Sequence, residues 1–201
     1  MSVNVYASPE RYVQGENATL QLGEQMKLIG LEGPVLIVGD PVIVPMLQDL
    51  WKESLNRSGY SEYYIHIFGG ECCKSEIEKI GVMAKEHGCK TIVAVGGGKA
   101  IDAGKCVAPI VNAALVSCPT IASTDAPCSA LAVVYTEGGE FEEYVFPKRH
   151  PSLVLVDSTL IAKAPKRLLI GGLGDALATW FEARTVREAQ TRTTFWVGNR
   201  L

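Results

Sequence analysis

The stretch VAVGGGKAID at residues 93–102 constrains the fold of this chain more than any other part of its sequence. The apolar, β-branched run that ends at Val95 predicts a buried strand, and a helical pattern begins at Lys99. A strand that turns through glycines into a helix can bind an anion, because the first N–H groups of the helix have no intrahelical partner and the helix dipole adds partial positive charge. The alternative is a plain tight turn, since the spacing matches neither G-x-G-x-x-G nor G-x-x-x-x-G-K-[ST].

Strand and helix patterns alternate on both sides of this stretch. Strand-like runs lie at 34–38, 63–68 and 113–117, and helical spacing covers 42–57 and 75–88. Alternation at this spacing predicts a doubly wound, parallel α/β sheet with right-handed crossovers. Ligands of such sheets bind at the carboxyl ends of the strands. The residues expected on that rim are Asp40, 96–99 and 120–125.

Capping residues predict where two of the helices begin. Residues 5–13 look extended, and residues 17–29 then predict an amphipathic helix with Asn17 as its N-cap. Ser75, followed by Glu78, predicts a capping box for the helix that leads to the glycine stretch.

The pattern changes in the last third of the chain. Strand-like runs lie at 131–135, 140–146 and 153–156. A Glu-Gly-Gly turn predicts that the first two form a hairpin. Pro165 marks a boundary, beyond which 168–201 predicts a helical region with a glycine-rich opening. Leu177, Trp180 and Phe181 form an apolar stripe there, which we expect to be covered by self-association or by folding back onto the sheet domain.

The composition is that of a globular chain, with 47% hydrophobic and 20% charged residues. A net charge of −3 gives no electrostatic case for binding nucleic acid or an anionic membrane. No apolar run has membrane-spanning length and no signal-peptide layout is present, so we expect a cytoplasmic protein without a membrane partner. The 6 cysteines show no C-x-x-C spacing, which favours reduced, structural thiols over a disulfide framework.

Several motifs together resemble one family of enzymes. The motifs are GGGKAID at 96–102, PTIASTDAPCSA at 119–130, VYTE at 134–137 and GLGDA at 172–176. They resemble the glycerol dehydrogenases of the iron- or zinc-dependent alcohol dehydrogenase superfamily, over essentially the whole chain. The resemblance implies a Rossmann-like, parallel-sheet NAD-binding α/β domain at 1–164. It also implies that 165–201 is the incomplete start of an all-helical metal-binding domain, in a dehydroquinate-synthase-like architecture.

The same resemblance implies an activity. NAD would accept a hydride from glycerol, or from a related small vicinal diol, and glycerol would become dihydroxyacetone. The family carries out this step at zinc or another divalent metal, because a cation lowers the pKa of the bound hydroxyl and leaves the carbon ready to lose hydride. The full-length form would be a homo-oligomer.

One set of positions matches the cofactor-binding residues of the family. They are Asp40, Gly97, Gly98, Lys99, Thr120, Ser123, Ser129, Leu131 and Tyr135. The resemblance assigns the glycines and the lysine to the pyrophosphate, and the last three positions to the nicotinamide end. A carboxylate at Asp40 can accept hydrogen bonds from ribose hydroxyls and repel a 2′-phosphate, which favours NAD over NADP. The alternatives are an Asp-Pro turn at Asp40 and an ordinary loop for the Ser and Thr residues near the prolines.

Two aspartates match residues of the family's substrate and metal sites. Asp125 corresponds to a residue of the glycerol pocket, where a carboxylate can accept a hydrogen bond from a polyol hydroxyl, and Asp175 corresponds to a metal ligand. Each has an ordinary alternative as a helix N-cap. Asp102 and Lys105 are three residues apart on the helix that follows the glycines, and we interpret them as a surface ion pair.

The histidines do not complete a metal site. The family uses two histidine ligands further along its chain, whereas His66, His87 and His150 all precede Asp175. Their positions in a strand, at a helix end and in an exposed loop give them ordinary structural roles. One carboxylate does not hold zinc in a catalytic geometry. We therefore expect these 201 residues to correspond to the N-terminal part of such an enzyme, and not to oxidise glycerol alone.

Two other functions stay open at this point. The chain could be a non-catalytic NAD-binding module that works only with a partner chain carrying the histidines. It could also belong to a relative that acts on a phosphorylated polyol. Asp125 argues against the second alternative, because an acidic residue in the pocket would repel a phosphate.

Overall fold

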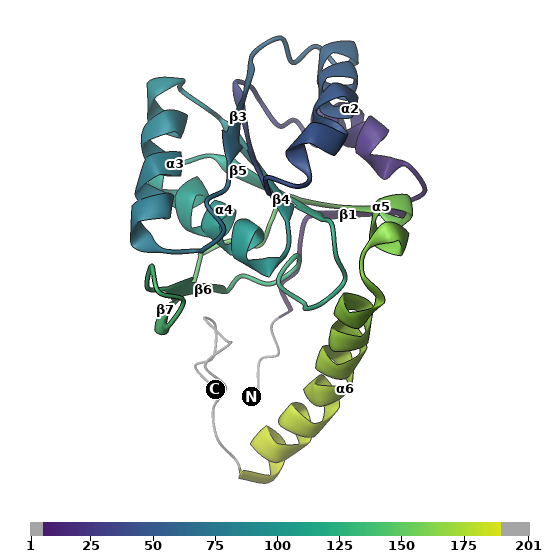
Figure 1. Ribbon diagram of the computed structural model, residues 1–201, viewed down its shortest axis with the longest axis vertical. Helices are drawn as coiled ribbons and strands as arrows, with labels where there is room; N and C mark the ends of the chain where they lie inside the picture. Colours follow the sequence, from purple (N-terminus) through teal and green to yellow (C-terminus); the bar gives the residue numbers. More distant parts are fainter. Residues whose placement is uncertain (1–5, 190–201) are drawn as a thin grey trace.

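The structure is a computed structural model that describes residues 6–189, and its centre is a six-stranded parallel sheet (Figure 1). The sheet has the spatial order β1-β8-β5-β4-β2-β3. Its strands are β1 (Arg11–Gly15), β2 (Val35–Gly39), β3 (Tyr63–Ile67), β4 (Thr91–Gly96), β5 (Ala114–Pro119) and β8 (Leu153–Asp157). A separate antiparallel hairpin consists of β6 (Ala132–Tyr135) and β7 (Phe141–Val145). The predicted parallel α/β sheet is confirmed.

Helices cover both faces of the sheet (Figure 1). They are the 3₁₀ helix η1 (Ala18–Gln21), α1 (Leu22–Leu28), α2 (Val44–Arg57), α3 (Lys74–Glu86), α4 (Gly98–Ile110) and the short α5 (Ser158–Lys163). The last helix, α6 (Lys166–Ala189), extends away from the sheet. Successive residues of a strand point to opposite faces, so each buried strand feeds two cores. In β2, Leu36 packs with residues of α3 and α4, whereas Ile37 packs with residues of α1 and α2.

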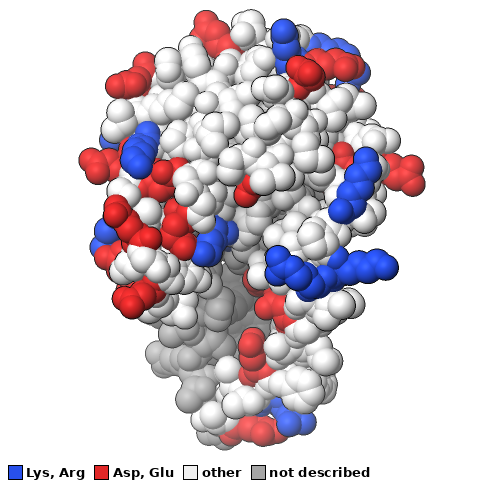
Figure 2. Space-filling model, in the orientation of Figure 1, with Lys and Arg blue, Asp and Glu red and all other residues white. Residues whose placement is uncertain are grey.

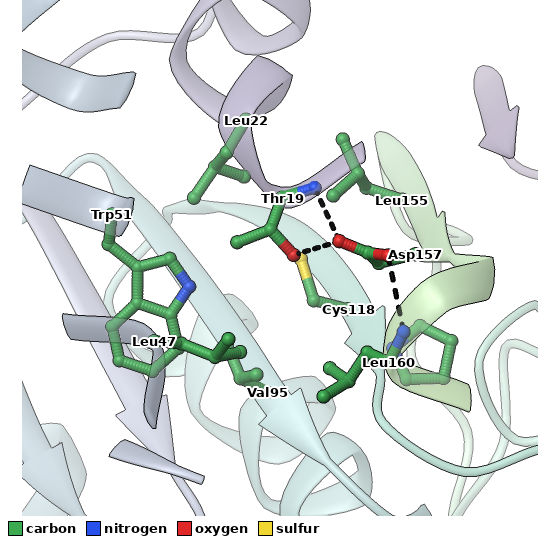
Figure 3. Close-up of a pocket in the computed structure, with 10 residues that line it drawn as sticks. Thr19, Leu22, Leu47, Trp51, Val95, Cys118, Leu155, Asp157 and Leu160 are labelled. Carbon is green, nitrogen blue, oxygen red and sulfur yellow. Dashed lines mark hydrogen bonds between the residues drawn. The ribbon is translucent and has the colours of Figure 1, made fainter. Parts of the chain in front are cut away.

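The start of the chain differs from the predictions. Residues 11–15 form the edge strand β1, which pairs in parallel with β8, where only an extended segment was expected. The helix predicted at 17–29 is divided into η1 and α1, and Asn17 makes no capping bond with its side chain. The cause is Asp157, at the end of β8. Its Oδ2 accepts hydrogen bonds from the Thr19 N–H at 3.0 Å and the Thr19 hydroxyl at 2.7 Å (Figure 3), which fixes the turn before α1.

Two helices begin slightly earlier than predicted. Helix α3 begins at Lys74 and has no side-chain cap, so the capping box at Ser75 and Glu78 is not formed. Helix α6 begins at Lys166 and runs through the glycine-rich segment, which the sequence placed at a helix start. The rest of the predicted helical region, 190–201, lies outside the described residues.

The apolar stripe of α6 is exposed in this structure. Leu177, Trp180 and Phe181 are 63%, 67% and 50% exposed. The expectation that the stripe folds back onto the sheet is therefore wrong for the part of α6 that the structure describes. Self-association through this stripe stays a prediction. Within residues 6–189 no helix has both the length and the apolar composition that crossing a bilayer requires.

Charged side chains of both signs are spread over the face of the molecule that Figure 2 shows. Acidic residues gather near the β6–β7 hairpin, where the Lys74 ammonium lies 2.7 Å from Glu142 and 3.3 Å from Glu143. On this face neither charge covers a broad continuous area, in line with the small net charge of −3.

The 6 cysteines are all free thiols, and Cys128 is the one that is not fully buried. Burial raises the pKa of Cys118 to about 12. A hydrogen bond with the Cys106 thiol, together with burial, raises the pKa of Cys72. Because the thiolate is the reactive form, these groups stay protonated and unreactive at neutral pH.

A thiol-labelling experiment checks this arrangement. With iodoacetamide at about pH 8, close to the ordinary thiol pKa, we expect Cys128 of the native chain to be modified first. The five buried thiols should react at a comparable rate only after denaturation. Mass spectrometry of native and denatured samples counts the modified thiols. Equal labelling of all cysteines in the native chain would contradict the burial described here.

Candidate functional site

The order of the strands places a topological switch point between β2 and β4. From β2 the chain passes through α2 to β3 on one side of the sheet, and from β4 it passes through α4 to β5 on the other side. Ligands of open α/β sheets bind at such a switch point, outside the carboxyl ends of the strands. Asp40 follows β2 and the glycine stretch follows β4. The two lie together, because the Asp40 N–H donates to the Val95 carbonyl at 3.1 Å.

Asp40 and the first glycine also approach each other closely. A Cβ atom added to Gly96 would lie 3.5 Å from the Asp40 Cβ and only 2.8 Å from the Ala100 Cβ. The Gly96 φ of 154° is one that residues with side chains rarely adopt. The Asp40 Oδ1 accepts a hydrogen bond from the Val42 N–H at 2.9 Å, so this carboxylate does start a turn. Its other oxygen makes no hydrogen bond within the described part of the chain, which leaves it available to a ligand on the rim.

Helix α4 begins directly after the glycine turn. Gly97 is its N-cap residue, with an extended backbone and no side-chain cap, and the first helical residue is Gly98. The first N–H groups therefore receive no protein side chain as a cap. This end of the helix can accept an anion, such as a phosphate, against its backbone.

Lys99 is held beside this turn by two neighbours. Its ammonium lies 2.5 Å from the Glu71 carboxylate and 5.2 Å from the centre of the Tyr135 ring. The side chain stays about half exposed, at 51%. Lys99, which the resemblance assigns to the pyrophosphate, and Tyr135, which it assigns to the nicotinamide end, are thus neighbours in this structure.

The loop from β5 to β6 covers the start of α4. It begins with buried Thr120, whose N–H donates to the Gly96 carbonyl at 3.0 Å. A Cβ atom at Gly98 would lie 3.6 Å from the Thr124 hydroxyl oxygen and 3.6 Å from the Ala126 Cβ. The loop, which also carries Ser123, thus lies beside the free N–H groups of α4.

Asp125 and Asp175 meet, although they are 50 residues apart. The Asp125 N–H donates to the Asp175 Oδ2 at 3.2 Å. Close approach of α6 makes this contact possible, because a Cβ atom at Gly172 would lie only 2.1 Å from the Ala122 carbonyl oxygen. Neither aspartate is a helix N-cap: Asp175 lies inside α6, and Asp125 lies in a turn that does not become a helix.

The described residues do not fit a complete metal site. Within residues 6–189, no three His, Cys, Asp or Glu side chains come together as a group that could hold a metal ion. The histidines have other partners. His66 lies 2.8 Å from Glu76, and His87 stacks on Tyr64 with 3.7 Å between ring centres. His150 is half-buried rather than exposed as predicted, because its Nδ1 lies 2.8 Å from the Cys128 carbonyl oxygen.

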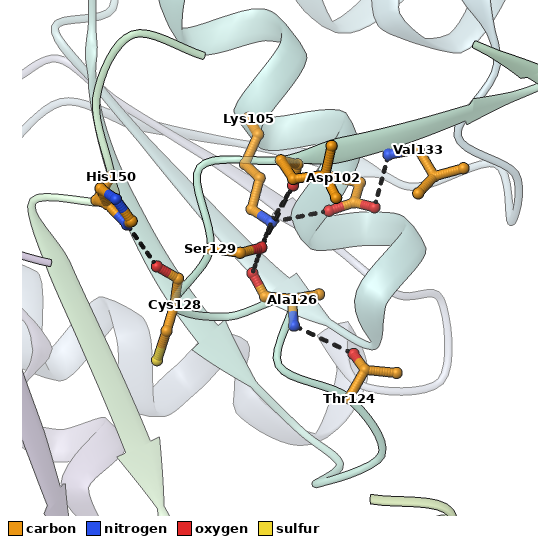
Figure 4. A network of polar contacts seen from close by, with 9 residues as sticks. Asp102, Lys105, Thr124, Ala126, Cys128, Ser129, Val133 and His150 are labelled. Carbon is orange, nitrogen blue, oxygen red and sulfur yellow. Dashed lines mark hydrogen bonds and ion pairs between the residues drawn. The ribbon is translucent and has the colours of Figure 1, made fainter. Parts of the chain in front are cut away.

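The interpretation of Asp102 and Lys105 as a surface pair is wrong. They do pair, at 3.0 Å, but Lys105 is 1% exposed and Asp102 is 7% exposed (Figure 4). The Lys105 ammonium also donates to the Ser129 hydroxyl at 3.0 Å and the Leu131 carbonyl at 2.6 Å. The sequence contains a usable signal, because α4 is apolar or small on nearly every side, and such a helix is buried all round.

Burial raises the pKa of the Asp102 carboxyl. The Lys105 ammonium and the Val133 N–H, which donates to Asp102 at 3.0 Å, act in the opposite direction. Burial is the larger effect, so this carboxylate is held in surroundings that disfavour its charge.

These features define an α/β domain of the dinucleotide-binding class, with a glycine turn, a free helix N-terminus and an acidic residue at the switch point. The family model of iron-containing alcohol dehydrogenases matches residues 9–158, and the chain belongs to this family.

Individual members of the family are also similar to this chain. The chain is 42% identical over 186 residues to a glycerol dehydrogenase of Pseudomonas putida, an alignment that covers 92% of this chain and 50% of the relative. It is also 42% identical over 186 residues to a glycolaldehyde reductase of Halobacterium salinarum, with the same coverage. The crystal structure of a probable glycerol dehydrogenase from Sinorhizobium meliloti superposes with a TM-score of 0.86 at 42% identity, covering 96% of this chain and 51% of that one. The chain spans about half the length of the curated relatives it matches.

Proposed function

We propose that this chain forms the NAD-binding part of an enzyme that oxidises small polyols. The observation that carries the proposal is the meeting of Asp40 with the glycine turn at the switch point of the sheet. Both similar curated relatives described above are named for the oxidation or reduction of small hydroxylated compounds. NAD, when bound, supplies the hydride acceptor.

Each end of the dinucleotide has proposed contacts along the rim. Asp40 would accept hydrogen bonds from the adenine ribose and exclude a 2′-phosphate, because its second carboxylate oxygen is free. Gly97, Gly98 and Lys99 would hold the pyrophosphate at the start of α4. Thr120 and Ser123 would contact the dinucleotide from the covering loop. The nicotinamide end would meet Ser129, Leu131 and Tyr135.

The substrate would bind beside the loop that carries Asp125. A carboxylate there can accept hydrogen bonds from glycerol or a related vicinal diol, with dihydroxyacetone as the product from glycerol. Asp175, which contacts the Asp125 N–H, is the proposed ligand for zinc or another divalent metal. One carboxylate does not make a catalytic metal site. Within residues 6–189, no three His, Cys, Asp or Glu side chains come together that could complete one.

The domain boundary is also a proposal. We assign 1–164 to the cofactor domain and 165–201 to a second, helical domain. The support is the change from the sheet-covering helices to α6, whose apolar side chains are exposed in the described part of the chain. The enzyme would act as a homo-oligomer. A non-catalytic NAD-binding module is the second candidate, and the incomplete metal site among the described residues favours it.

Titration with NADH and NADPH tests the cofactor proposal. We expect the chain to bind NADH more tightly than NADPH. The Asp40→Asn variant keeps an oxygen that can accept from the Val42 N–H, but it loses the charge that would repel a 2′-phosphate. The ratio of the two affinities should therefore shift toward NADPH by about tenfold, the effect of one charge-assisted hydrogen bond.

The exposed Asp49 of α2 provides a matched control. Asp49→Asn removes the same charge from the surface and should leave both affinities unchanged. Equal affinity of the unsubstituted chain for the two cofactors would refute the role of Asp40. A failure to bind either one would refute the proposed function as a whole.

A further inference from the structure

Lys105 and Asp102, at the centre of a buried polar cluster, have no role in the function described above. The Lys105 ammonium contacts three oxygen atoms, which belong to Asp102, Ser129 and Leu131 (Figure 4). Asp102 completes the cluster by accepting the Val133 N–H with its other oxygen. The Lys105–Asp102 pair on α4 thereby holds every second residue of the 129–133 segment, namely Ser129, Leu131 and Val133.

The cluster fixes the far end of the loop that covers the start of α4. The near end is fixed by the hydrogen bond from the Thr120 N–H to the Gly96 carbonyl. Between these two points the loop passes over Gly98, at the start of α4. Lys105 lies seven residues further along the same helix, which is about 10 Å along its axis. Helix α4 thus holds both the proposed phosphate site and the end of the loop with the proposed nicotinamide contacts.

A buried ion pair is a costly way to stabilise a fold. The desolvation of two charges offsets much of their attraction, and well-packed apolar side chains can replace such pairs at little or no loss of stability. What an apolar replacement cannot do is hold a serine hydroxyl and a backbone carbonyl at one fixed position. The contacts of Lys105 to Ser129 and Leu131 are of this directional kind.

We propose that Lys105 and Asp102 are positioning residues that set the place of the nicotinamide contacts relative to the phosphate site, by holding the 129–133 segment against α4. The inference rests on the proposed NAD site. Lys105 itself is buried beneath the loop and would not touch the cofactor. It acts through Ser129 and Leu131.

Two ligands that differ in the nicotinamide alone test this role. NADH spans the whole proposed site, whereas ADP-ribose contains the adenosine and pyrophosphate but lacks the nicotinamide. In the Lys105→Met variant of the full chain, affinity for NADH should fall about tenfold or more, because two directional hydrogen bonds to the loop are lost. Affinity for ADP-ribose should stay within about twofold. The increase in NADH fluorescence on binding should be lost with the same variant.

A second variant addresses the risk that Lys105→Met does not fold. Asp102→Asn keeps the shape of the side chain and an oxygen for the Val133 N–H, but it removes the charge opposite the ammonium. It should produce the same selective loss of NADH affinity, to a smaller degree. Lys85→Met, an exposed lysine of α3, is the matched control and should change neither affinity.

The outcomes separate this inference from the proposed function. A selective loss of NADH affinity in either variant supports the positioning role. Equal losses for NADH and ADP-ribose, or no loss in a folded variant, overturn it and leave NAD binding intact. If the unsubstituted chain binds neither ligand, the proposed function fails and this inference fails with it.

Discussion

Replacing Gly172 by alanine is expected to separate α6 from the loop that carries Asp125. The new Cβ atom would lie 2.1 Å from the Ala122 carbonyl oxygen and 3.2 Å from the Ser123 Cα. Both neighbours are backbone atoms, so no side-chain rotation can relieve the overlap. Inserting a methyl group into such a contact costs about 1–3 kcal/mol. The hydrogen bond from the Asp125 N–H to Asp175 should then break, because it depends on the same close approach.

The neighbouring Gly171 provides a matched control for this substitution. A Cβ atom there has no neighbour within 4 Å, although both glycines lie inside α6. Helix propensity alone predicts that alanine stabilises the helix by about 0.5–1 kcal/mol at either position. The close contact predicts that the two substitutions act in opposite directions.

Hydrogen exchange measures the difference. Peptides that contain residues 121–126 should exchange about tenfold faster in Gly172→Ala than in the unsubstituted chain, in keeping with the loss of a local contact. Gly171→Ala should leave their exchange unchanged. Circular dichroism would check that α6 stays helical in both variants. Matching exchange rates for the two variants would show that residues 121–126 are not held by the contact with α6.

The sequence was sufficient for the layers of the fold but not for its edges. Buried strands such as β2 and β4 are continuous apolar runs, and their pattern is unambiguous. Strand β1 has alternating exposure and lies at the edge of the sheet, where pairing with β8 alone holds it. Its sequence gives little sign of that distant partner. The helix predicted from Asn17 is divided for a similar reason, because Asp157, 140 positions along the chain, determines the turn.

Some residues of the candidate site could likewise be placed from the sequence, whereas others could not. Asp40 and the glycine turn could be placed together from the sequence, since both follow strands of one parallel sheet and must reach the same rim. The contact between Asp125 and Asp175 depends on the path of α6, which Gly172 allows by its lack of a side chain. Lys105 was misplaced because a charged pair three residues apart on a helix is ordinarily found at a surface.

In the proposed cofactor site the phosphates rest on the glycine turn, so substitution of this turn should have the largest effect on NADH affinity. In Gly96→Ala the new Cβ atom would lie 2.8 Å from the Ala100 Cβ, at a backbone φ of 154° that alanine rarely adopts. Relief of this strain requires a shift between the end of β4 and the start of α4. The first N–H groups of α4 and Asp40 would then lose their relative placement. We expect NADH affinity to fall by about two orders of magnitude, the result of about 3 kcal/mol of lost binding free energy.

Gly15 is the matched control for this substitution, because it ends β1 as Gly96 ends β4. A Cβ atom at Gly15 has no neighbour within 4 Å, so Gly15→Ala should leave NADH binding unchanged. Thermal unfolding of both variants identifies a temperature at which each is fully folded, and NADH titrations at that temperature report binding alone. Unchanged NADH affinity in a folded Gly96→Ala chain would mean that the phosphates do not rest on this turn. The dinucleotide site would then have to lie elsewhere on the rim.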